Sequence, residues 1–408
     1  MKYRQYDPEK DKKAVNRIWL ECGWIEKDDA KPMDTLVDAA KAIVANIDGQ
    51  PECIVVSTPG DMDYLGEKLS FSCIAAVTTG LVARKQKLAA HLTATRIALD
   101  AIDGFEVSGL GMFEQGYYNK LGYGTGSYDH FIRFSPATLT IDEDPRVPRR
   151  LEVDDFELVH KSRLTRTRAH GSVNIHLPEA TKAEMQWTKN GVGFGYCDDN
   201  GDLTHHFWMK GKGKEQGPFS IWWMAYRDTA QLRELLALLK SFGDQIHLVR
   251  MSQPPGIQLQ DILRQPFRFR TITEKSEYEN TMRAAAWQQY RICDLAACLE
   301  KTHLPGDPVR FNLKLDDPIE KYLDAGIGWQ GISGEYIITL GPDSDAEKGS
   351  DNTLPSMHAS VGAFTRLWLG VLSASGLAFS DNLTAPTELL HRLDHLIRVP
   401  SPTPDWEF

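Results

Sequence analysis

The sequence predicts an α+β protein built from three consecutive segments, and three observations lead to this prediction. The chain has 408 residues, a length that at roughly 150 residues per domain suggests two or three domains. Helix and strand signals alternate along it. Apolar residues make up 42% of the chain and charged residues 25%, so enough apolar surface is available for packed cores and disorder is not indicated.

The first segment, residues 1–137, opens with a helix signal. Asp7 and Pro8 form an N-cap followed by a proline in the first helical position. Behind this helix come an apolar run typical of a central strand, a helix with leucines on one face, and a short strand. This β-α-β order indicates a mixed domain. The three elements are expected at residues 70–79, 86–103 and 105–111.

A proline-containing cluster of charges at residues 135–155 predicts a boundary, after which a second segment covers residues 150–284. Its central part has a hairpin turn at Asp198–Gly201 between two strands. Asp228, with Gln231 three residues later, has the pattern of a capping box and predicts a helix that ends at Gly243. The order of these elements resembles that of the first segment, without sequence identity. The expected elements are a hairpin at 193–209, a strand at 220–225 and a helix from 228 to 243.

The third segment, residues 285–408, again mixes helices and strands. Residues 309–315 alternate apolar and polar side chains, as a half-buried strand does. The last ten residues, VPSPTPDWEF, contain three prolines, which favour an extended tail over a helix. The other elements are expected to be helices at 291–300, 363–375 and 387–397, a strand at 335–340 and a loop at 342–352.

The charge balance is acidic, with 46 Lys and Arg against 56 Asp and Glu and a net charge of -10. A nucleic-acid partner is not expected, because binding phosphate backbones requires a basic surface. Cationic small molecules or basic peptides are compatible with this balance. The N-terminus is polar and unlike a secretory signal, and the most apolar stretch, 364–379, is too short to span a bilayer. A cytoplasmic protein without a membrane span is therefore expected, while export stays open.

Cysteine and histidine patterns do not indicate a metal. The six cysteines are scattered and include no C-x-x-C pair, which predicts free thiols in a reducing compartment. His391, Asp394 and His395 have part of a zinc-helix spacing, but a third ligand is not evident, so solvated side chains are the favoured interpretation.

The connection between the predicted strand and helix at residues 77–90 carries the strongest chemical signal. A strand that ends at Thr79 leads through Gly80 and a basic loop with Arg84 and Lys85 into the helix. Free N–H groups and the helix dipole make such an N-terminus suited to a pyrophosphate. Cations there oppose the dipole, and their presence suggests an anionic ligand. On the residues alone, a solvated basic loop is about equally well supported.

Two motifs at this point resemble those of a known family. Arg84-x-x-x-x-Ala89, entering a helix, is similar to the R/Q-x-x-G-x-G/A coenzyme A loop of GNAT acyltransferases. The sequence YNKLGYG from Tyr118 to Gly124 is similar to the Y-x-R/K-x-G-F/Y element that closes GNAT domains. Three further features are the order of the three segments, the sequence LWLG at 367–370 and the terminal Glu-Phe. Together with the two motifs, they make the whole chain resemble the Eis (enhanced intracellular survival) family of acetyltransferases.

The resemblance implies a specific domain organisation. A GNAT acetyl-CoA-binding domain would comprise residues 1–137, a second, degenerate GNAT-like domain residues 150–284, and a sterol-carrier-protein-like α/β domain residues 285–408, whose C-terminal tail enters the active site. A homo-oligomer, commonly a hexamer, is also implied.

The resemblance also implies where acetyl-CoA binds, and that no metal is needed. The cofactor would lie along the strand end, with its pyrophosphate on the N–H groups of the loop. Lys87 departs from the family pattern, because it occupies the position of the first loop glycine. A lysine can donate its N–H there if its φ is negative, or it can hinder the cofactor. The implied cofactor-binding residues are Val77, Thr78, Thr79, Arg84, Lys85, Gln86, Lys87, Leu88, Ala89, Ala90, Phe113 and Glu114.

The catalytic roles follow from the same resemblance. Tyr118 would be the general acid that gives a proton to the leaving thiolate. The C-terminal carboxylate of Phe408 would be the general base, with a pKa raised from about 3.5 by desolvation. Trp406 and Glu407 of the tail would contact the acceptor. Trp24 and Asp28, which follow the first helix, either line the acceptor cleft or have packing and surface roles.

The function implied is acetyl-CoA-dependent N-acetyl transfer to an amine of a cationic small molecule or side chain, such as an aminoglycoside, a polyamine or a lysine. The alternative is a catalytically weakened GNAT scaffold that binds a lipid or apolar ligand through its sterol-carrier-like domain.

Overall fold

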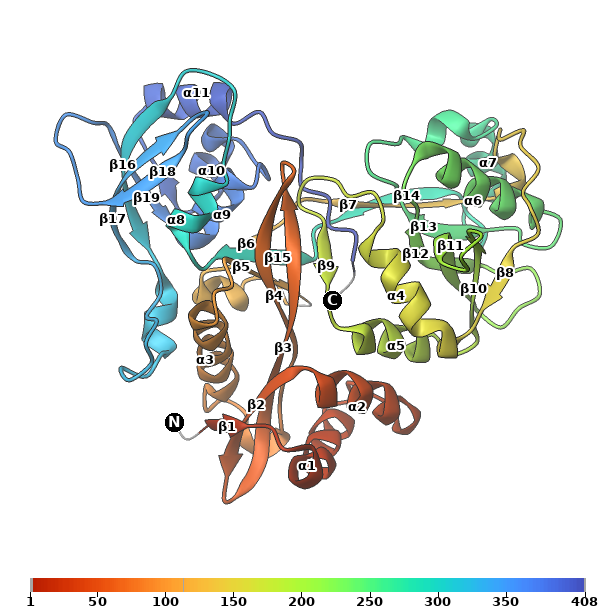
Figure 1. The fold of residues 1–408 in the computed structure, drawn as a ribbon, viewed down its shortest axis with the longest axis horizontal. Coiled ribbons are helices and arrows are strands. Elements are labelled where there is room, and N and C mark those ends of the chain that lie inside the picture. Colours follow the sequence, from red (N-terminus) through yellow and green to blue (C-terminus); the bar gives the residue numbers. More distant parts are fainter. Residues whose placement is uncertain (1–2, 113, 407–408) are drawn as a thin grey trace. The chain divides into compact units, whose positions relative to one another are not determined.

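The structure, a computed structural model, describes residues 3–112 and 114–406 (Figure 1). The chain divides into two compact units that are each built from separate stretches of sequence. The first unit contains residues 1–127, 169–176 and 286–408, and the second contains residues 128–168 and 177–285. The division of the sequence into three consecutive domains stays a prediction.

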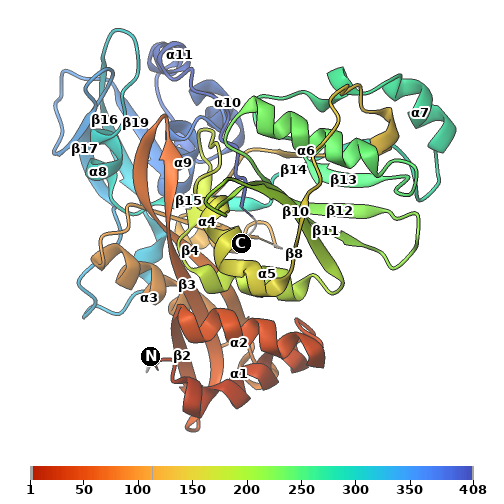
Figure 2. The same ribbon diagram turned by 45° about the vertical axis from the view of Figure 1, so that its right-hand side comes forward.

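The first unit is organised around an eight-stranded sheet. Seven of its strands follow the order β1-β2-β3-β4-β5-β15-β6, and β9 pairs with β3. Neighbouring strands are antiparallel except β4 and β5, which are parallel. Helix α3 covers one side of the sheet, and α1 and α2 lie on the other side (Figures 1 and 2). The strands are β1 (Tyr3–Gln5), β2 (Lys41–Ile47), β3 (Gln50–Tyr64), β4 (Glu67–Thr79), β5 (Val107–Gly111), β6 (Gly124–Thr125), β9 (Val173–Ile175) and β15 (Gln288–Ile292).

The helices of this sheet confirm the signals in the sequence. Helix α1 (Pro8–Glu21) starts at the expected cap, where the side chain of Asp7 accepts a hydrogen bond from the N–H of Glu9. Helix α2 spans Ala30–Ala39, and α3 spans Leu88–Ile102, within the predicted range. Their apolar faces pack on the sheet, whose central strand β3 is almost fully buried, while β4 alternates between buried and half-buried residues toward its end.

Strand β4 contains an extra residue beside its partner β3. Ile54 is opposite Thr78 and Val56 is opposite Ala75, so β4 has two residues where β3 has only Val55. Ala76, in this bulge, has a φ of 52°. Bulges bend a strand, and the ladder between β4 and β5 ends at the pair of Ile74 and Leu110. The last residues of β4 therefore extend beyond the ladder with β5.

The second unit has a seven-stranded sheet of order β14-β7-β13-β12-β11-β10-β8. The predicted hairpin, strand and helix are confirmed, and Asp228 caps α6 by accepting a hydrogen bond from the N–H of Gln231. Strand β7, which the sequence predictions placed in the first segment, belongs to this sheet because it pairs with β13 and β14. The elements are β7 (Asp129–Phe134), β8 (Arg149–Leu151), α4 (Phe156–Leu164), α5 (Pro178–Trp187), β10 (Gly191–Cys197), β11 (Leu203–Gly211), β12 (Phe219–Ala225), α6 (Thr229–Ser241), β13 (Val249–Ser252), α7 (Pro266–Thr273) and β14 (Thr281–Ala285).

A five-stranded sheet of order β18-β17-β16-β19-β20 also belongs to the first unit. The alternating strand is confirmed as β16, whose side chains are alternately buried and more exposed. The likeness of this part to sterol carrier proteins stays a prediction. Its elements are α8 (Leu295–Glu300), β16 (Val309–Asp316), β17 (Gly334–Leu340), β18 (Asp345–Lys348), β19 (Ser356–Ser360), α9 (Val361–Trp368), α10 (Ala374–Ser380), β20 (Leu383–Thr384) and α11 (Thr387–Leu396).

Three expectations for the third segment were wrong. The helix expected at 291–300 starts later, because residues up to Ile292 form β15 between β5 and β6, and Asp294 then caps α8. The helix expected at 363–375 is interrupted near Gly370, which has a φ of 73°, so two helices form. The loop expected at 342–352 contains β18, paired with β17.

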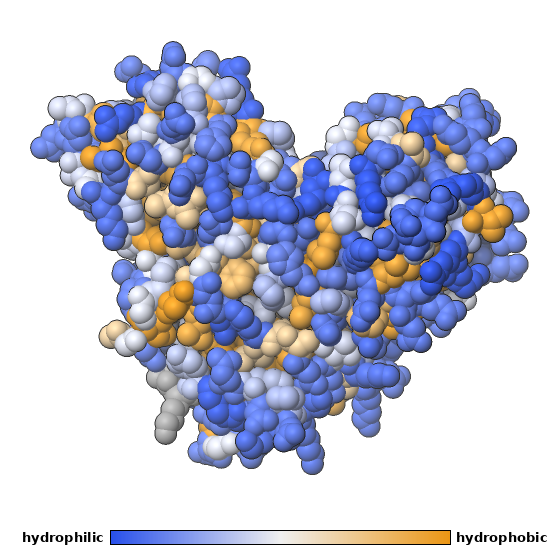
Figure 3. Space-filling model, viewed as in Figure 1, coloured by the Kyte–Doolittle hydropathy of each residue, from blue (hydrophilic) through white to orange (hydrophobic). Residues whose placement is uncertain are grey.

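Polar residues predominate on the face of the protein drawn in Figure 3, and apolar side chains there form small groups. Among the described residues, none of the helices is both long and apolar enough to cross a membrane.

Two glycines let α9 approach strand β6 closely. A Cβ atom on Gly362 would lie 2.7 Å from the carbonyl oxygen of Tyr123, and one on Gly124 would meet the carbonyl oxygen of Gly362. Because backbone atoms cannot move away cheaply, we expect Gly362→Ala to lower the free energy of unfolding by about 1–3 kcal/mol. Chemical denaturation measures this. Gly326→Ala, where a Cβ meets no atom within 4 Å, is the control and should change little; equal effects of both would contradict the prediction.

Candidate active site

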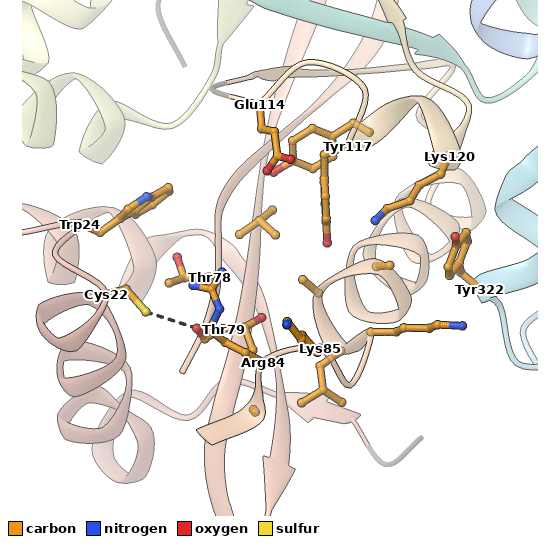
Figure 4. A pocket seen from close by; sticks show the side chains of 17 residues that line it. Cys22, Trp24, Thr78, Thr79, Arg84, Lys85, Glu114, Tyr117, Lys120 and Tyr322 are labelled. Atoms are coloured by element: carbon orange, nitrogen blue, oxygen red, sulfur yellow. Dashed lines mark hydrogen bonds between the residues drawn. The ribbon is translucent and has the colours of Figure 1, made fainter. Parts of the chain in front are cut away.

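A pocket of about 550 Å³ lies in the first unit where β4, the start of α3 and the turn that carries Tyr118 come together (Figure 4). In this view Trp24 and Cys22 lie on one side, Lys120 and Tyr322 on the opposite side, and Arg84 and Lys85 along the base. The lining residues are Cys22, Trp24, Val77, Thr78, Thr79, Ala83, Arg84, Lys85, Lys87, Leu88, Ala89, Ala90, Glu114, Tyr117, Tyr118, Lys120 and Tyr322.

Most of the residues predicted for the site line this one pocket. Gln86 and Trp406 do not line it, and Asp28 lies exposed on a short 3-10 helix, Lys27–Asp29, away from the lining. Phe113, Glu407 and Phe408 are outside the described residues. The structure adds five residues that sequence reasoning did not assign to the site: Cys22, Ala83, Tyr117, Lys120 and Tyr322.

Helix α1 fixes the end of β4. The indole Nε1 of Trp19 donates a hydrogen bond to Thr78 Oγ1 at 3.2 Å, and Cys22 Sγ donates to the carbonyl oxygen of Thr79 at 3.3 Å. Thr79 Oγ1 donates in turn to Cys53 Sγ at 3.2 Å. These contacts hold the bent end of β4 as one wall of the pocket.

The basic loop after β4 is fixed at its start by two glutamates. The N–H of Gly80 donates to the carbonyl oxygen of Glu52 at 2.8 Å, and the N–H of Leu81 donates to Glu21 Oε1 at 2.9 Å. Arg17 joins the two carboxylates, at 2.6 Å from Glu52 and 3.4 Å from Glu21. Elements α1 and β3 therefore set the position from which the loop runs to α3.

The loop has the backbone conformation of glycines at two lysines. Lys85 has a φ of 63°, and Lys87, the N-cap of α3, has a φ of 61°. The negative φ considered for Lys87 is therefore not observed; the lysine adopts the left-handed conformation that glycine adopts without strain. No side chain caps α3, so the N–H groups of its first turn are available to an anion.

The cations around the pocket lack carboxylate partners. Among the described residues, Arg84, Lys85, Lys87 and Lys120 form no ion pair. Nζ of Lys120 lies 3.5 Å from the centroid of the Tyr117 ring, and burial lowers the pKa of Lys120. Arg84, Lys85 and Lys87, without an ion pair to any described residue and next to an uncapped helix N-terminus, form a site whose charge fits a polyphosphate.

Tyr118 opens a 3-10 turn, Tyr118–Leu121, that ends at Gly122, whose φ is 83°. The side chain is buried, at 4% exposure, yet the hydroxyl has no hydrogen-bond partner among the described residues. Burial raises the pKa of Tyr118 well above its usual value, and Tyr117 and Glu114 raise it further. The phenol therefore keeps its proton at neutral pH.

The two neighbouring tyrosines have different environments. The hydroxyl of Tyr123 is hydrogen-bonded to Ser108 Oγ at 2.8 Å in the core, in keeping with the packing role predicted for it. Tyr117 lines the pocket beside Tyr118, with ring centroids 4.9 Å apart. Burial raises the pKa of Tyr117 to about 12.

The C-terminal tail is extended and anchored to the first unit, as far as residue 406. Trp406 is 2% exposed. Its carbonyl oxygen accepts a hydrogen bond from Gln288, which pairs with Gly111 at the end of β5. The tail therefore reaches the end of β5, the strand that precedes Glu114 of the pocket in the sequence. The anchoring bonds are Ser127 Oγ to Pro402 O, Thr403 N to His170 O at 2.8 Å, Val173 N to Asp405 Oδ1 at 3.3 Å and Gln288 Nε2 to Trp406 O at 3.1 Å.

A metal site is not found among residues 3–112 and 114–406, where no three His, Cys, Asp or Glu side chains are grouped to hold an ion.

Comparison with known proteins identifies the fold. No protein-family model and no curated protein matches the sequence. Solved structures match over all of this chain. A GCN5-related N-acetyltransferase from Anabaena variabilis matches with a TM-score of 0.78 and 15% identity, and 100% of its own chain is covered. A probable N-acyltransferase from Enterococcus faecalis matches with a TM-score of 0.77 and 17% identity, and 99% of its own chain is covered. This chain thus has the whole-chain fold of GCN5-related N-acetyltransferases.

A further match narrows the resemblance. Eis1 from Mycobacterium abscessus covers 100% of this chain and is itself 100% covered, with a TM-score of 0.77 and 12% identity. The Eis-like GNAT resemblance predicted from the sequence is confirmed at the level of the fold.

The strain in the basic loop gives a prediction. Because Lys87 adopts a left-handed φ, Lys87→Gly should relieve strain of about 1–2 kcal/mol, partly offset by the entropy that glycine loses on folding. We expect a free energy of unfolding that is unchanged or up to about 1 kcal/mol higher, measured by chemical denaturation. Gln86→Gly is the matched control, since Gln86 lacks a positive φ, and it should destabilise. A clear loss of stability in Lys87→Gly would contradict the prediction.

Proposed function

We propose that this protein is an acetyl-CoA-dependent N-acetyltransferase that acts on an amine of a cationic acceptor. The observation that carries the proposal is one pocket that joins the bent end of β4, the uncapped start of α3, and a buried tyrosine that keeps its proton. Arg84, Lys85 and Lys87 precede this helix and form no ion pair with any described residue. The full-length fold match to GCN5-related N-acetyltransferases supports it.

The residues present fit acetyl-CoA, which supplies the acetyl group as an activated thioester. The side chains of Arg84, Lys85, Lys87 and Lys120 and the N–H groups at the start of α3 would bind its phosphates. The backbone of Val77–Thr79, beyond the ladder with β5, offers polar groups to the pantetheine arm and an N–H donor for charge that develops on the thioester oxygen.

Tyr118 Oη would hold the proton that the leaving sulfur takes up. Since burial raises its pKa, the proton stays in place throughout the neutral range, and the hydroxyl has no described partner that competes for it. A phenol of raised pKa is a weak acid, so its contribution includes a hydrogen bond to the sulfur as negative charge develops there.

The acceptor amine must lose a proton, because a free alkylamine has a pKa of about 10. The base in this proposal is the C-terminal carboxylate of Phe408, which lies outside the described residues. Its support is the anchored course of the tail up to Trp406, next to the end of β5. Glu407 is proposed to contribute negative charge near the acceptor.

Trp24 and Glu114 are suited to a cationic acceptor. The indole of Trp24 is 42% exposed at the pocket, where a cation could lie over its face, and Glu114 adds a carboxylate on the same lining. An aminoglycoside, a polyamine and a lysine side chain share this chemistry. A contact of Trp406 or Asp28 with the acceptor, a homo-oligomer and a cytoplasmic location stay predictions.

The lipid-binding alternative has less support. An apolar pocket in the part of the unit that contains the five-stranded sheet is filled, since Trp368 stacks on Tyr64 with ring centroids 4.3 Å apart and about 0 Å³ is left for a ligand. A larger pocket of about 620 Å³ on this sheet is lined mainly by polar side chains, among them Lys314, Glu335 and His358, which do not favour an apolar ligand.

Tyr118→Phe tests the proposed acid. The substitution should lower kcat for acetyl transfer by about a hundredfold or more, with coenzyme A affinity retained, because only the proton donor is lost. A thiol-release assay with acetyl-CoA and a panel of polyamines and aminoglycosides measures it. Tyr117→Phe is the matched control and should keep most of the rate. In the wild type, the rate should show no loss from ionisation of Tyr118 below about pH 10; full activity of Tyr118→Phe refutes the acid role.

Adding one alanine after Phe408 tests the proposed base. The extension moves the carboxylate by about 3.5 Å, which should reduce kcat by about a hundredfold while coenzyme A still binds in calorimetry. Asp244→Asn, a change at an exposed residue of the second unit, is the control for a substitution that does not line the pocket and should leave the rate unchanged. An extended protein with the wild-type rate means that another group is the base.

A further inference from the structure

A fully buried ion pair lies beneath the turn of Tyr118. Arg291, on β15, donates from Nη2 to Asp317 Oδ2 at 2.6 Å, and both side chains are 0% exposed. Neither residue lines the pocket. Burying two charges is costly unless they make several further hydrogen bonds, so the other partners of this pair indicate what it does.

On one side, the pair holds the turn that carries Tyr118. Nη1 of Arg291 donates to the carbonyl oxygen of Leu121, the last residue of the 3-10 turn. The next residue must be glycine: Gly122 has a φ of 83°, and a Cβ there would lie 2.8 Å from Arg291 Nη1 and 3.0 Å from Asp317 Oδ1. The turn thus rests directly on the two charged groups.

On the other side, Asp317 holds a second turn of the pocket. It caps the 3-10 helix Pro318–Tyr322, as its Oδ1 accepts a hydrogen bond from the N–H of Ile319 at 3.2 Å, and its Oδ2 accepts from the N–H of Ile332 at 3.0 Å. Tyr322 ends this helix and lines the pocket. His91 of α3 secures it further by donating from Nδ1 to the carbonyl oxygen of Tyr322 at 2.8 Å.

We propose that Arg291 and Asp317 are positioning residues that hold the turns of Tyr118 and Tyr322 in register across the cofactor pocket. This role rests on the proposed acetyl transfer. It means that residues after position 286 contribute to the active site by holding its turns in place. An apolar pair could fill the same space, but it could not bond both to the carbonyl of Leu121 and to the N–H groups of Ile319 and Ile332. Even a small displacement of a turn that carries a catalytic residue lowers the reaction rate strongly.

Asp317→Asn and Arg291→Lys test this proposal in the full-length protein. Asp317→Asn keeps the shape of the side chain but removes its charge and one acceptor oxygen. Arg291→Lys keeps the positive charge, but a single ammonium group cannot donate to Leu121 and Asp317 with the geometry of the planar guanidinium. Arg163→Lys is the matched control, since Arg163 forms a buried ion pair with Glu184 in the second unit. Each variant is measured well below its own melting temperature for hydrogen exchange, coenzyme A affinity and acetyl transfer.

For Asp317→Asn we expect faster amide exchange in both stretches, 118–124 and 318–323. Its coenzyme A affinity should be about tenfold lower and its kcat about a hundredfold lower. Arg291→Lys should show the same changes with a smaller loss. Arg163→Lys should lower the melting temperature without these changes. Wild-type exchange, affinity and kcat in folded Asp317→Asn would overturn the proposal, as would equal losses in Arg163→Lys. If Asp317→Asn does not fold, Arg291→Lys decides by the same criteria.

If the wild-type protein neither binds coenzyme A nor transfers acetyl groups, the proposed function fails, while the exchange measurement still decides whether the pair couples the two turns.

Discussion

The pocket depends on the point at which β4 leaves β5. The extra residue at Ala76 bends β4, and the ladder between the two strands ends two residues earlier, at Ile74. A continuous parallel ladder would use the backbone groups of Val77–Thr79 within the sheet. Because the strands part, the edge of this stretch that faces away from β3 is outside any ladder with β5 and can meet a ligand, while Thr78 and Thr79 still pair with β3. Trp19 and Cys22 of α1 hold the bent strand in place. The loop, the helix start and the Tyr118 turn are then arranged around this opening.

Charge is distributed unevenly around this opening. The chain as a whole carries a net charge of -10, yet the loop before α3 presents Arg84, Lys85 and Lys87 without carboxylate partners among the described residues. Two acidic side chains near the loop, Glu21 and Glu52, form ion pairs with Arg17. The carboxylate of Glu21 and the backbone carbonyl of Glu52 also accept hydrogen bonds from the start of the loop. They therefore order the loop without pairing with its cations, which leaves the positive field to an anionic ligand.

The glycine position at Lys87 shows how the fold overrides local preference. The sequence has a lysine where the coenzyme A loops that it resembles have glycine, and the backbone still adopts a φ of 61°. The loop that holds Lys87 is anchored at Gly80 and Leu81 and leads into α3. Lysine can adopt this conformation at a modest cost, and it adds a positive charge to the loop.

Local sequence signals were sufficient to predict several of the helices and strands and the motif that marks the pocket, since caps, apolar periodicity and the loop between Thr79 and Leu88 depend on neighbours along the chain. The pocket-lining residues of β4, the basic loop and the start of α3 were predicted from that motif and the family resemblance. The folded structure was needed to show that β7 pairs with β13 and β14, that residues up to Ile292 form β15 between β5 and β6, that Cys22 and Tyr322 reach the same pocket, and that Arg291 meets Asp317 beneath the Tyr118 turn. These are long-range pairings, and a residue's local sequence carries little information about a partner that lies far along the chain and is met only when separate elements pack together.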